Sequence, residues 1–301
     1  MNTTRWKDKS ISSLDEVSSK VNDAISDDLT GVIRWHDWKV TKNFPEVMKF
    51  IVAGQPVTFN VFKFTFLQTN HSEINEIEEM NPKSGFVIGY EYKGGINYII
   101  NQNSLAKKIL RKIMKYDSKG EVIKEMPKCD TDFFYWLIYR IYMKKTLIDP
   151  ESDYLHLLNL DGIYGLRGDT EDESTKIPAS GESIMNTISA LSFFLESSHI
   201  DMVKLDLKYD EHTNIRLMLK DGVISTEPKY YIGPFESEEE DLKISKLYLL
   251  IYLEIIPILR QEYLNDYYGG TWNRETYRNF LNKLGEQVSS RIEEKIKDYR
   301  N

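Results

Sequence analysis

Strict alternation of side chains along Val57–Leu67 constrains the fold of this chain more than any other feature of its sequence. Successive residues of a β-strand point to opposite faces of a sheet, so a period of two predicts a strand. Phe59 and Val61 fall on one face, and Phe62 and Phe64 fall on the other. Because both faces carry aromatic or β-branched residues, the pattern predicts a strand that is mostly buried.

Glycine-containing turns join further alternating segments into hairpins. Phe86–Lys93 is followed by Ile96–Asn101 across Gly94-Gly95, which is a strong signal for a two-residue turn. Farther along the chain, a meander that turns at Asp221-Gly222 is predicted from the strands Val203–Tyr209, Asn214–Lys220 and Val223–Thr226. The sheets are therefore expected to be antiparallel.

Apolar residues at three- and four-residue steps predict helices between and after these strands. The two longest are Leu242–Tyr267, where we expect Pro257 to kink the helix, and Asn273–Tyr299, which Asn273 is expected to cap. Shorter helices are expected over Ser13–Ser26, Pro45–Ala53, Ser72–Met80, Ser104–Tyr116, Asp130–Lys145 and Ser183–Ser197.

These elements indicate an α+β fold in which antiparallel sheets pack with helices and two long helices end the chain. The 301 residues allow two domains, and 41% hydrophobic content is typical of a folded protein. Pro150 and the polar Glu151–Asp153 mark the expected boundary. Residues 1–150 would form an α/β unit with an antiparallel sheet and two helices, and residues 151–301 the meander and the long helices.

The net charge of -8 argues against broad binding to nucleic acid, which requires clustered Lys and Arg. A local basic patch is still a candidate for such binding. It consists of Lys107, Lys108, Arg111, Lys112 and Lys115 on one predicted helix.

Cysteine and histidine spacing predicts no metal and no cofactor. Cys129 is the single cysteine, which excludes an internal disulfide and fits a reducing compartment, and no two histidines have the spacing of a helical metal site. The apolar run Leu247–Leu259 is shorter than the ~20 residues that a bilayer requires. We see no secretory signal in Met1–Ser13, so the protein is expected to be cytoplasmic, with no membrane partner.

A magnesium-dependent nuclease is the alternative that we keep for the function. Such sites place an acid-x-Lys motif on a strand, so that carboxylates hold Mg²⁺ and the lysine positions water. The candidates are Glu91 with Lys93 and Asp206 with Lys208, completed by an acid such as Glu73, Glu76 or Asp169. A strand whose solvent-exposed face carries Glu and Lys has the same acid-x-Lys sequence pattern without any catalytic role, so an enzyme is not favoured.

Aromatic side chains suggest a contact surface instead. Tyr and Trp are enriched at protein interfaces, because they bury a large area at a low cost in entropy. We expect partly exposed rings at Tyr135, Tyr139, Tyr267, Tyr268 and Trp272. The expected partner is another protein or a second copy of the chain, as in a homo-oligomer.

With its many Lys, Ile, Asn and Tyr residues and no catalytic motif, the chain resembles uncharacterised proteins of bacterial phage-defence loci and phage-encoded anti-defence inhibitors. The resemblance transfers no individual residues. It implies a non-catalytic interaction component of a bacterium–phage conflict system, acting by stoichiometric binding or self-assembly.

Overall fold

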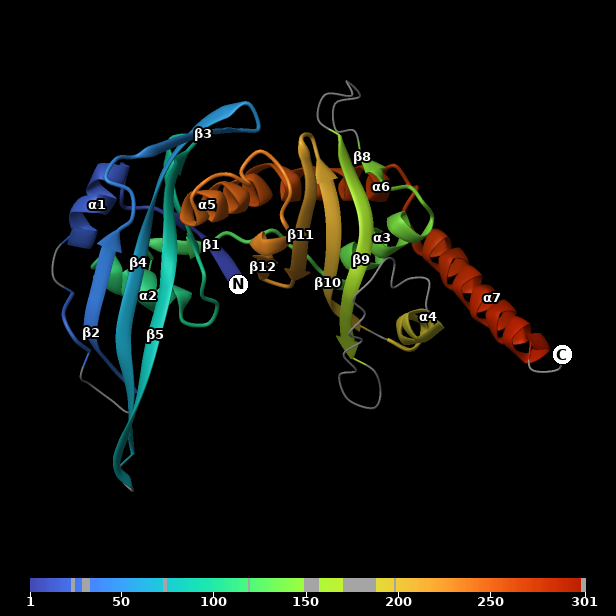
Figure 1. Ribbon diagram of the computed structural model, residues 1–301, viewed down its shortest axis with the longest axis horizontal. Coiled ribbons are helices and arrows are strands. Elements are labelled where there is room, and N and C mark those ends of the chain that lie inside the picture. The colour runs from blue at the N-terminus through green and yellow to red at the C-terminus, as the bar shows by residue number, and fades with distance from the viewer. Residues whose placement is uncertain are drawn as a thin grey trace. The chain divides into compact units, whose positions relative to one another are not determined.

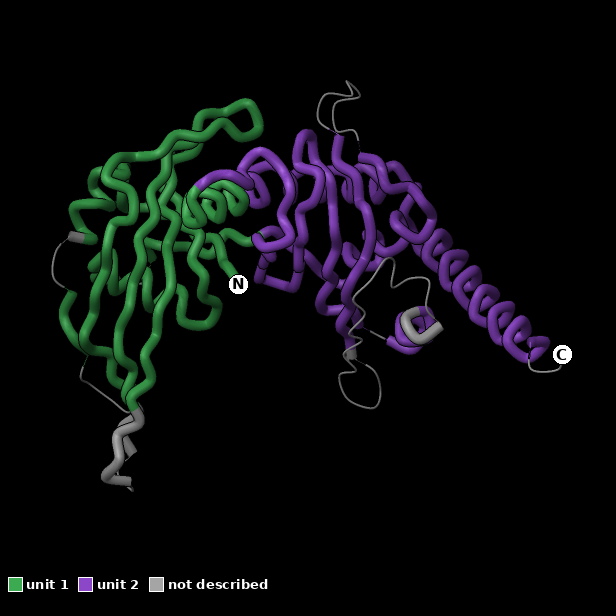
Figure 2. Tube along the Cα trace, in the orientation of Figure 1, with its two compact units in different colours: residues 1–126, 239–249 green, residues 127–238, 250–301 purple. Residues whose placement is uncertain are grey.

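The computed structural model describes residues 1–22, 25–28, 33–72, 75–118, 120–148, 157–169, 188–197 and 199–298. The chain divides into two compact units (Figure 2), which are residues 1–126 with 239–249 (unit 1) and residues 127–238 with 250–301 (unit 2). The boundary expected at Pro150 lies outside the described residues, and the first change of unit falls between Met126 and Pro127. Antiparallel strands packed with helices confirm the α+β class (Figure 1).

Unit 1 is built on an antiparallel sheet with the strand order β2-β4-β5-β6-β1, in which β3 also pairs with β4 and β7 with β1. The long strand β4 contains the alternating segment Val57–Leu67, and the hairpin predicted after it joins β5 to β6. The strands are β1 (Asn2–Asp8), β2 (Ile33–Lys42), β3 (Met48–Val52), β4 (Gln55–Ser72), β5 (Asn75–Tyr92), β6 (Gly95–Ile100) and β7 (Val122–Lys124).

Most of the segment Val57–Leu67 in β4 is buried, as its sequence predicts, and helices of unit 1 pack on both of its faces. Phe62 and Phe64 belong to the core formed with α1 (Leu14–Asn22) and α2 (Ala106–Ile113). On the other face, α5 (Glu240–Leu250) is held by the ion pair of Lys63 with Asp241 (2.5 Å) and by the Phe86–Tyr248 ring contact (6.2 Å).

Two of the expected helices are strands. Pro45–Ala53 contains β3, because Ala53 and Gly54 take positive φ values (50° and 65°) and turn the chain back to pair with β4. Ser72–Met80 falls in the β4–β5 hairpin, where pairing continues from Asn70 with Glu79 to Ser72 with Asn75. Pairing with a neighbouring strand outweighs local helix propensity in both segments.

Unit 2 has a second antiparallel sheet with the order β12-β11-β10-β9-β8, which confirms the predicted meander. Helix α3 (Thr131–Tyr142) packs against β9 and β10. The strands are β8 (Leu147–Ile148), β9 (Leu158–Asp169), β10 (His199–Tyr209), β11 (His212–Lys220) and β12 (Val223–Thr226).

The remaining helices of unit 2 are α4 (Ile188–Glu196), α6 (Ile256–Tyr268) and α7 (Arg274–Asp298). A π-helical turn, Ile251–Ile255, precedes α6, and Pro257 sits in the first turn of α6, where its missing N–H costs little. Asn273 caps α7 by accepting a hydrogen bond from the Thr276 N–H (2.9 Å), and α7 extends away from the sheet of unit 2 (Figure 1). Over the described ranges, no helix combines the length and apolar character needed to cross a bilayer.

Candidate functional site

The first acid-x-Lys motif does not lie on one strand. Glu91 is on β5 opposite Thr58, whereas Lys93 is in the turn between β5 and β6 with φ 52°. The two-residue turn is Lys93-Gly94, one position earlier than predicted. The Lys93 ammonium lies 5.1 Å from the centre of the Tyr92 ring. Glu91 and Lys93 therefore lack the shared strand face that a nuclease motif needs.

The second motif is used in cross-strand ion pairs. Asp206 accepts two hydrogen bonds from Arg216 on β11 (2.9 and 3.1 Å), and Lys208 pairs with Asp161 on β9 (3.0 Å).

The acids expected to complete the motifs fall outside the described part of the chain, which includes neither Glu73 nor the side chains of Glu76 and Asp169. Among the described residues, no group of three or more His, Cys, Asp or Glu side chains is placed to hold a metal ion.

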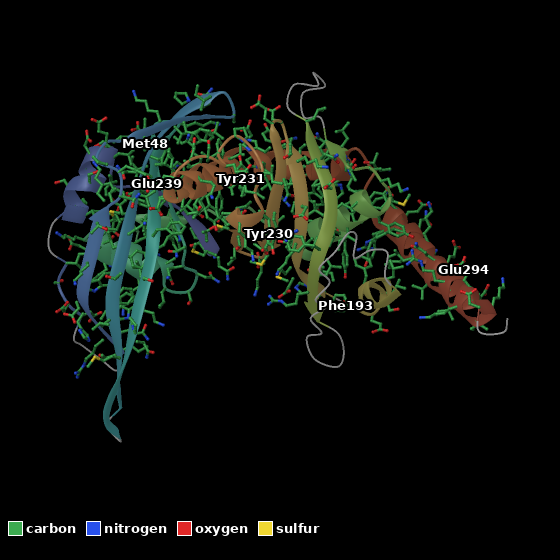
Figure 3. All side chains as sticks on the ribbon, viewed as in Figure 1. Met48, Phe193, Tyr230, Tyr231, Glu239 and Glu294 are labelled. Atoms are coloured by element: carbon green, nitrogen blue, oxygen red, sulfur yellow. The ribbon has the colours of Figure 1, made fainter. Side chains whose placement is uncertain are left out.

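Several charged side chains of the unit 2 sheet are paired with one another across neighbouring strands. The Arg216 guanidinium lies over the rings of Tyr164 (4.2 Å) and Tyr230 (4.0 Å), in addition to its bond with Asp206. Tyr230 is labelled in Figure 3. Arg167 similarly holds Asp201 through both carboxylate oxygens. This arrangement explains the alternating charges as sheet stabilisation.

Two of the five residues of the predicted basic patch make contacts within unit 1. Lys108 lies over the Trp35 ring (4.0 Å) and 3.6 Å from the Asp28 carboxylate. Arg111 donates to the Ser118 carbonyl (2.8 Å), which fastens the loop after α2. Lys107 and Lys112 are partly exposed on the same helix. Asp28 therefore partly neutralises the patch, and its binding to nucleic acid stays a prediction.

Three of the five aromatic residues expected at the surface are buried. Tyr135 and Tyr139 are each 7% exposed and Trp272 is 2% exposed, so the expected exposure is wrong for them. Their rings pack between helices, Tyr135 against Phe194 and Tyr277 and Tyr139 against Trp272 and Phe280. In contrast, Tyr267 is 52% exposed and Tyr268 is 81% exposed.

These two exposed tyrosines line a pocket in unit 2 of about 480 Å³, a volume typical of ligand sites. The start of α3, the end of α6 and the start of α7 form its walls. The aromatic lining is Tyr263, Tyr267, Tyr268, Trp272 and Tyr277, and the charged lining is Lys128, Asp130, Asp132, Arg260 and Arg274.

Both carboxylates of the pocket have partners within it. Asp132 accepts hydrogen bonds from the Tyr263 hydroxyl (2.6 Å) and the Trp272 indole N–H (3.0 Å), and so joins α3 to α6 and to the loop before α7. Asp130 caps α3 through the Phe133 N–H (3.1 Å) and pairs with Lys128 (3.0 Å). Burial opposes ionisation of Asp130, but these bonds outweigh it and lower the pKa of Asp130.

The two arginines of the pocket are less engaged. The Arg260 guanidinium stacks on the rings of Phe133 (5.1 Å) and Tyr263 (5.0 Å), and its Nη1 is buried with no hydrogen-bond partner among the described residues. Arg274, the first residue of α7, makes no side-chain ion pair or hydrogen bond with the described residues.

The sequence motifs did not point to Arg260, Arg274 or Asp132. For Arg260 and Arg274, the one sequence signal is that they lie close along the chain to Tyr267, Tyr268 and Trp272. No protein-family model matches the chain, and comparison with curated proteins returns no match. The argument for a function therefore rests on this pocket and its exposed tyrosines.

Proposed function

We propose that this protein is a non-catalytic component that binds another protein stoichiometrically, and that the Tyr267–Tyr268 pair and the pocket beside it form the binding site. The observation that carries the proposal is the 81% exposure of Tyr268 at a pocket of about 480 Å³. A bacterium–phage conflict in the cytoplasm is the proposed setting, and it rests on the resemblance of the sequence alone.

The physical argument concerns the cost of exposing aromatic rings. Unit 2 buries most of its aromatic side chains, including the large rings of Phe133, Trp136 and Trp272. Two adjacent tyrosines left in water keep apolar area that a partner would cover, and their hydroxyls keep hydrogen-bonding capacity. Exposed Tyr beside a preformed pocket is typical of interface positions that contribute most of the binding energy.

The test is recovery of one binding partner by tagged wild-type protein, followed by titration calorimetry with that partner in purified form. We expect 1:1 binding that Tyr268→Ala weakens by about tenfold or more. Tyr230→Ala is the matched control, since Tyr230 is 41% exposed but lies outside the pocket, and it should bind as wild type does.

Three outcomes would contradict the proposal. One is a partner that binds the wild type and Tyr268→Ala equally. Another is light scattering that shows a second copy of the chain as the sole partner. The third is plasmid cleavage with Mg²⁺ that is lost in Lys208→Ala, which would restore the nuclease alternative.

A further inference from the structure

The buried guanidinium nitrogen of Arg260 lacks the hydrogen bond that such a group needs. Its Nη1 has no partner among the described residues. Buried polar atoms in folded proteins are nearly always hydrogen-bonded, and leaving a charged donor unpaired is costly. Arg260 also lines the pocket, and none of its guanidinium nitrogens has a hydrogen-bond partner among the described residues. Its accessible N–H groups can therefore donate to an acceptor that a ligand supplies.

The stacking of Arg260 keeps this donor in place. Phe133 of α3 and Tyr263 of α6 both lie against the guanidinium, with ring centres about 5 Å away. A guanidinium held over aromatic rings retains its planar fork of N–H donors, which matches the two oxygens of a carboxylate. The site is preorganised for an anion because little side-chain entropy remains to be lost.

Charges around the pocket favour an anion with a single charge. Lys128 is paired with Asp130, and Asp132 already accepts two hydrogen bonds. Arg260 and Arg274 have no hydrogen-bonded carboxylate of their own, although the charge of Arg260 also helps to lower the pKa of Asp130. The positive end of the α7 dipole adds to the positive charge at Arg274. The two carboxylates would repel a doubly charged phosphate monoester more strongly than a carboxylate.

We propose that the pocket binds a carboxylate next to an aromatic residue, presented by an acidic segment of the partner protein. The carboxylate would accept from Arg260 and Arg274, and the neighbouring ring would pack on Tyr267 and Tyr268. This inference rests on the proposed function, because the carboxylate comes from the bound protein.

N-acetyl-phenylalanine is the probe, since it joins one carboxylate to one aromatic ring. Its neutral amide, N-acetyl-phenylalaninamide, is the matched control. We expect chemical shift changes at pocket residues, with millimolar affinity for so small a probe and about tenfold weaker binding of the amide. Arg260→Gln should weaken binding of the acid by about tenfold, whereas Arg278→Gln, on the exposed side of α7, should not change it.

Equal binding of the acid and the amide would overturn the inference, as would tighter binding of adenosine monophosphate, which would indicate a nucleotide site. If Arg260→Gln unfolds, Arg260→Lys replaces it, and it should still weaken binding because a lysine lacks the planar fork. Unchanged probe affinity in the folded variant also contradicts the inference.

The two proposals fail separately. Partner binding that persists in a protein with no affinity for the acid leaves the proposed function standing and removes the carboxylate site. Affinity for the acid without any protein partner removes the proposed function alone.

Discussion

Cys129 lies at the start of unit 2 and is 1% exposed. Burial raises the pKa of its thiol to about 12, so the reactive thiolate is scarce at neutral pH. We expect a disulfide reagent such as dithionitrobenzoate to react with the native protein at least roughly 100-fold more slowly than with the unfolded chain. Full labelling of the native protein within seconds would show that Cys129 is accessible.

His212 is a second buried titratable residue, enclosed by Tyr209, Tyr231 and Phe235. Burial lowers its pKa from 6.5 to about 4, against a smaller opposing effect of Asp210. The unfolded chain therefore takes up a proton first as the pH falls, and stability is lost from about pH 6.5 down to about pH 4.

We expect this loss to be on the order of 3 kcal/mol in the free energy of unfolding, because each pH unit between the two pKa values contributes about 1.4 kcal/mol. Urea denaturation at a series of pH values measures it, and His212→Gln should flatten the slope within this window. A slope that is the same in both proteins would show that His212 does not cause the pH dependence.

At the scale of the element, Arg140 connects the end of α3 to α6. Its side chain is 8% exposed and donates to the carbonyls of Lys145 (2.7 Å) and Leu147 (2.8 Å). The guanidinium also pairs with Glu262 (2.9 Å) and Asp266 (3.0 Å). This network stabilises the packing of the helix pair that positions the pocket.

Replacing Arg140 should therefore destabilise unit 2. Arg140→Met removes the cation that pairs with Glu262 and Asp266 and the donor to two carbonyls, although Asp266 keeps its hydrogen bonds from Trp136 and Thr271. We expect a loss of about 3–5 kcal/mol in the free energy of unfolding. Urea denaturation measures the loss. Lys283→Met, at an exposed position of α7, is the control and should change stability by less than about 0.5 kcal/mol. A loss for Arg140→Met no larger than that of the control would mean that the ion pairs contribute nothing.

Elements were predictable where their cause is local. The two-residue period of β4 and the glycine turns before β6 and β12 lie within short stretches of chain. The prediction of helices was wrong at β3 and at the start of β5, because the strand conformation of both segments depends on pairing with β4. The local propensity of a segment carries no information about the strand with which it pairs.

For the whole molecule, the charge distribution predicts weak interaction with nucleic acid. The net charge is -8, and Lys108 and Arg111 are held by Asp28 and Ser118. At about 150 mM salt we expect no binding of a fluorescent DNA duplex at about 10 μM protein, measured by anisotropy. Binding that weakens steeply with added salt, and that is lost in Lys107→Glu, would contradict this expectation.

The sequence by itself determined the antiparallel strands, the long final helix and the α+β class, because periodicity, turns and caps act between near neighbours. Tertiary structure alone decided which aromatic rings are buried and where the pocket forms. Asp132 meets Tyr263 and Trp272 across 131 and 140 positions of the chain. Such contacts depend on how helices pack on a sheet, and no local pattern encodes that packing.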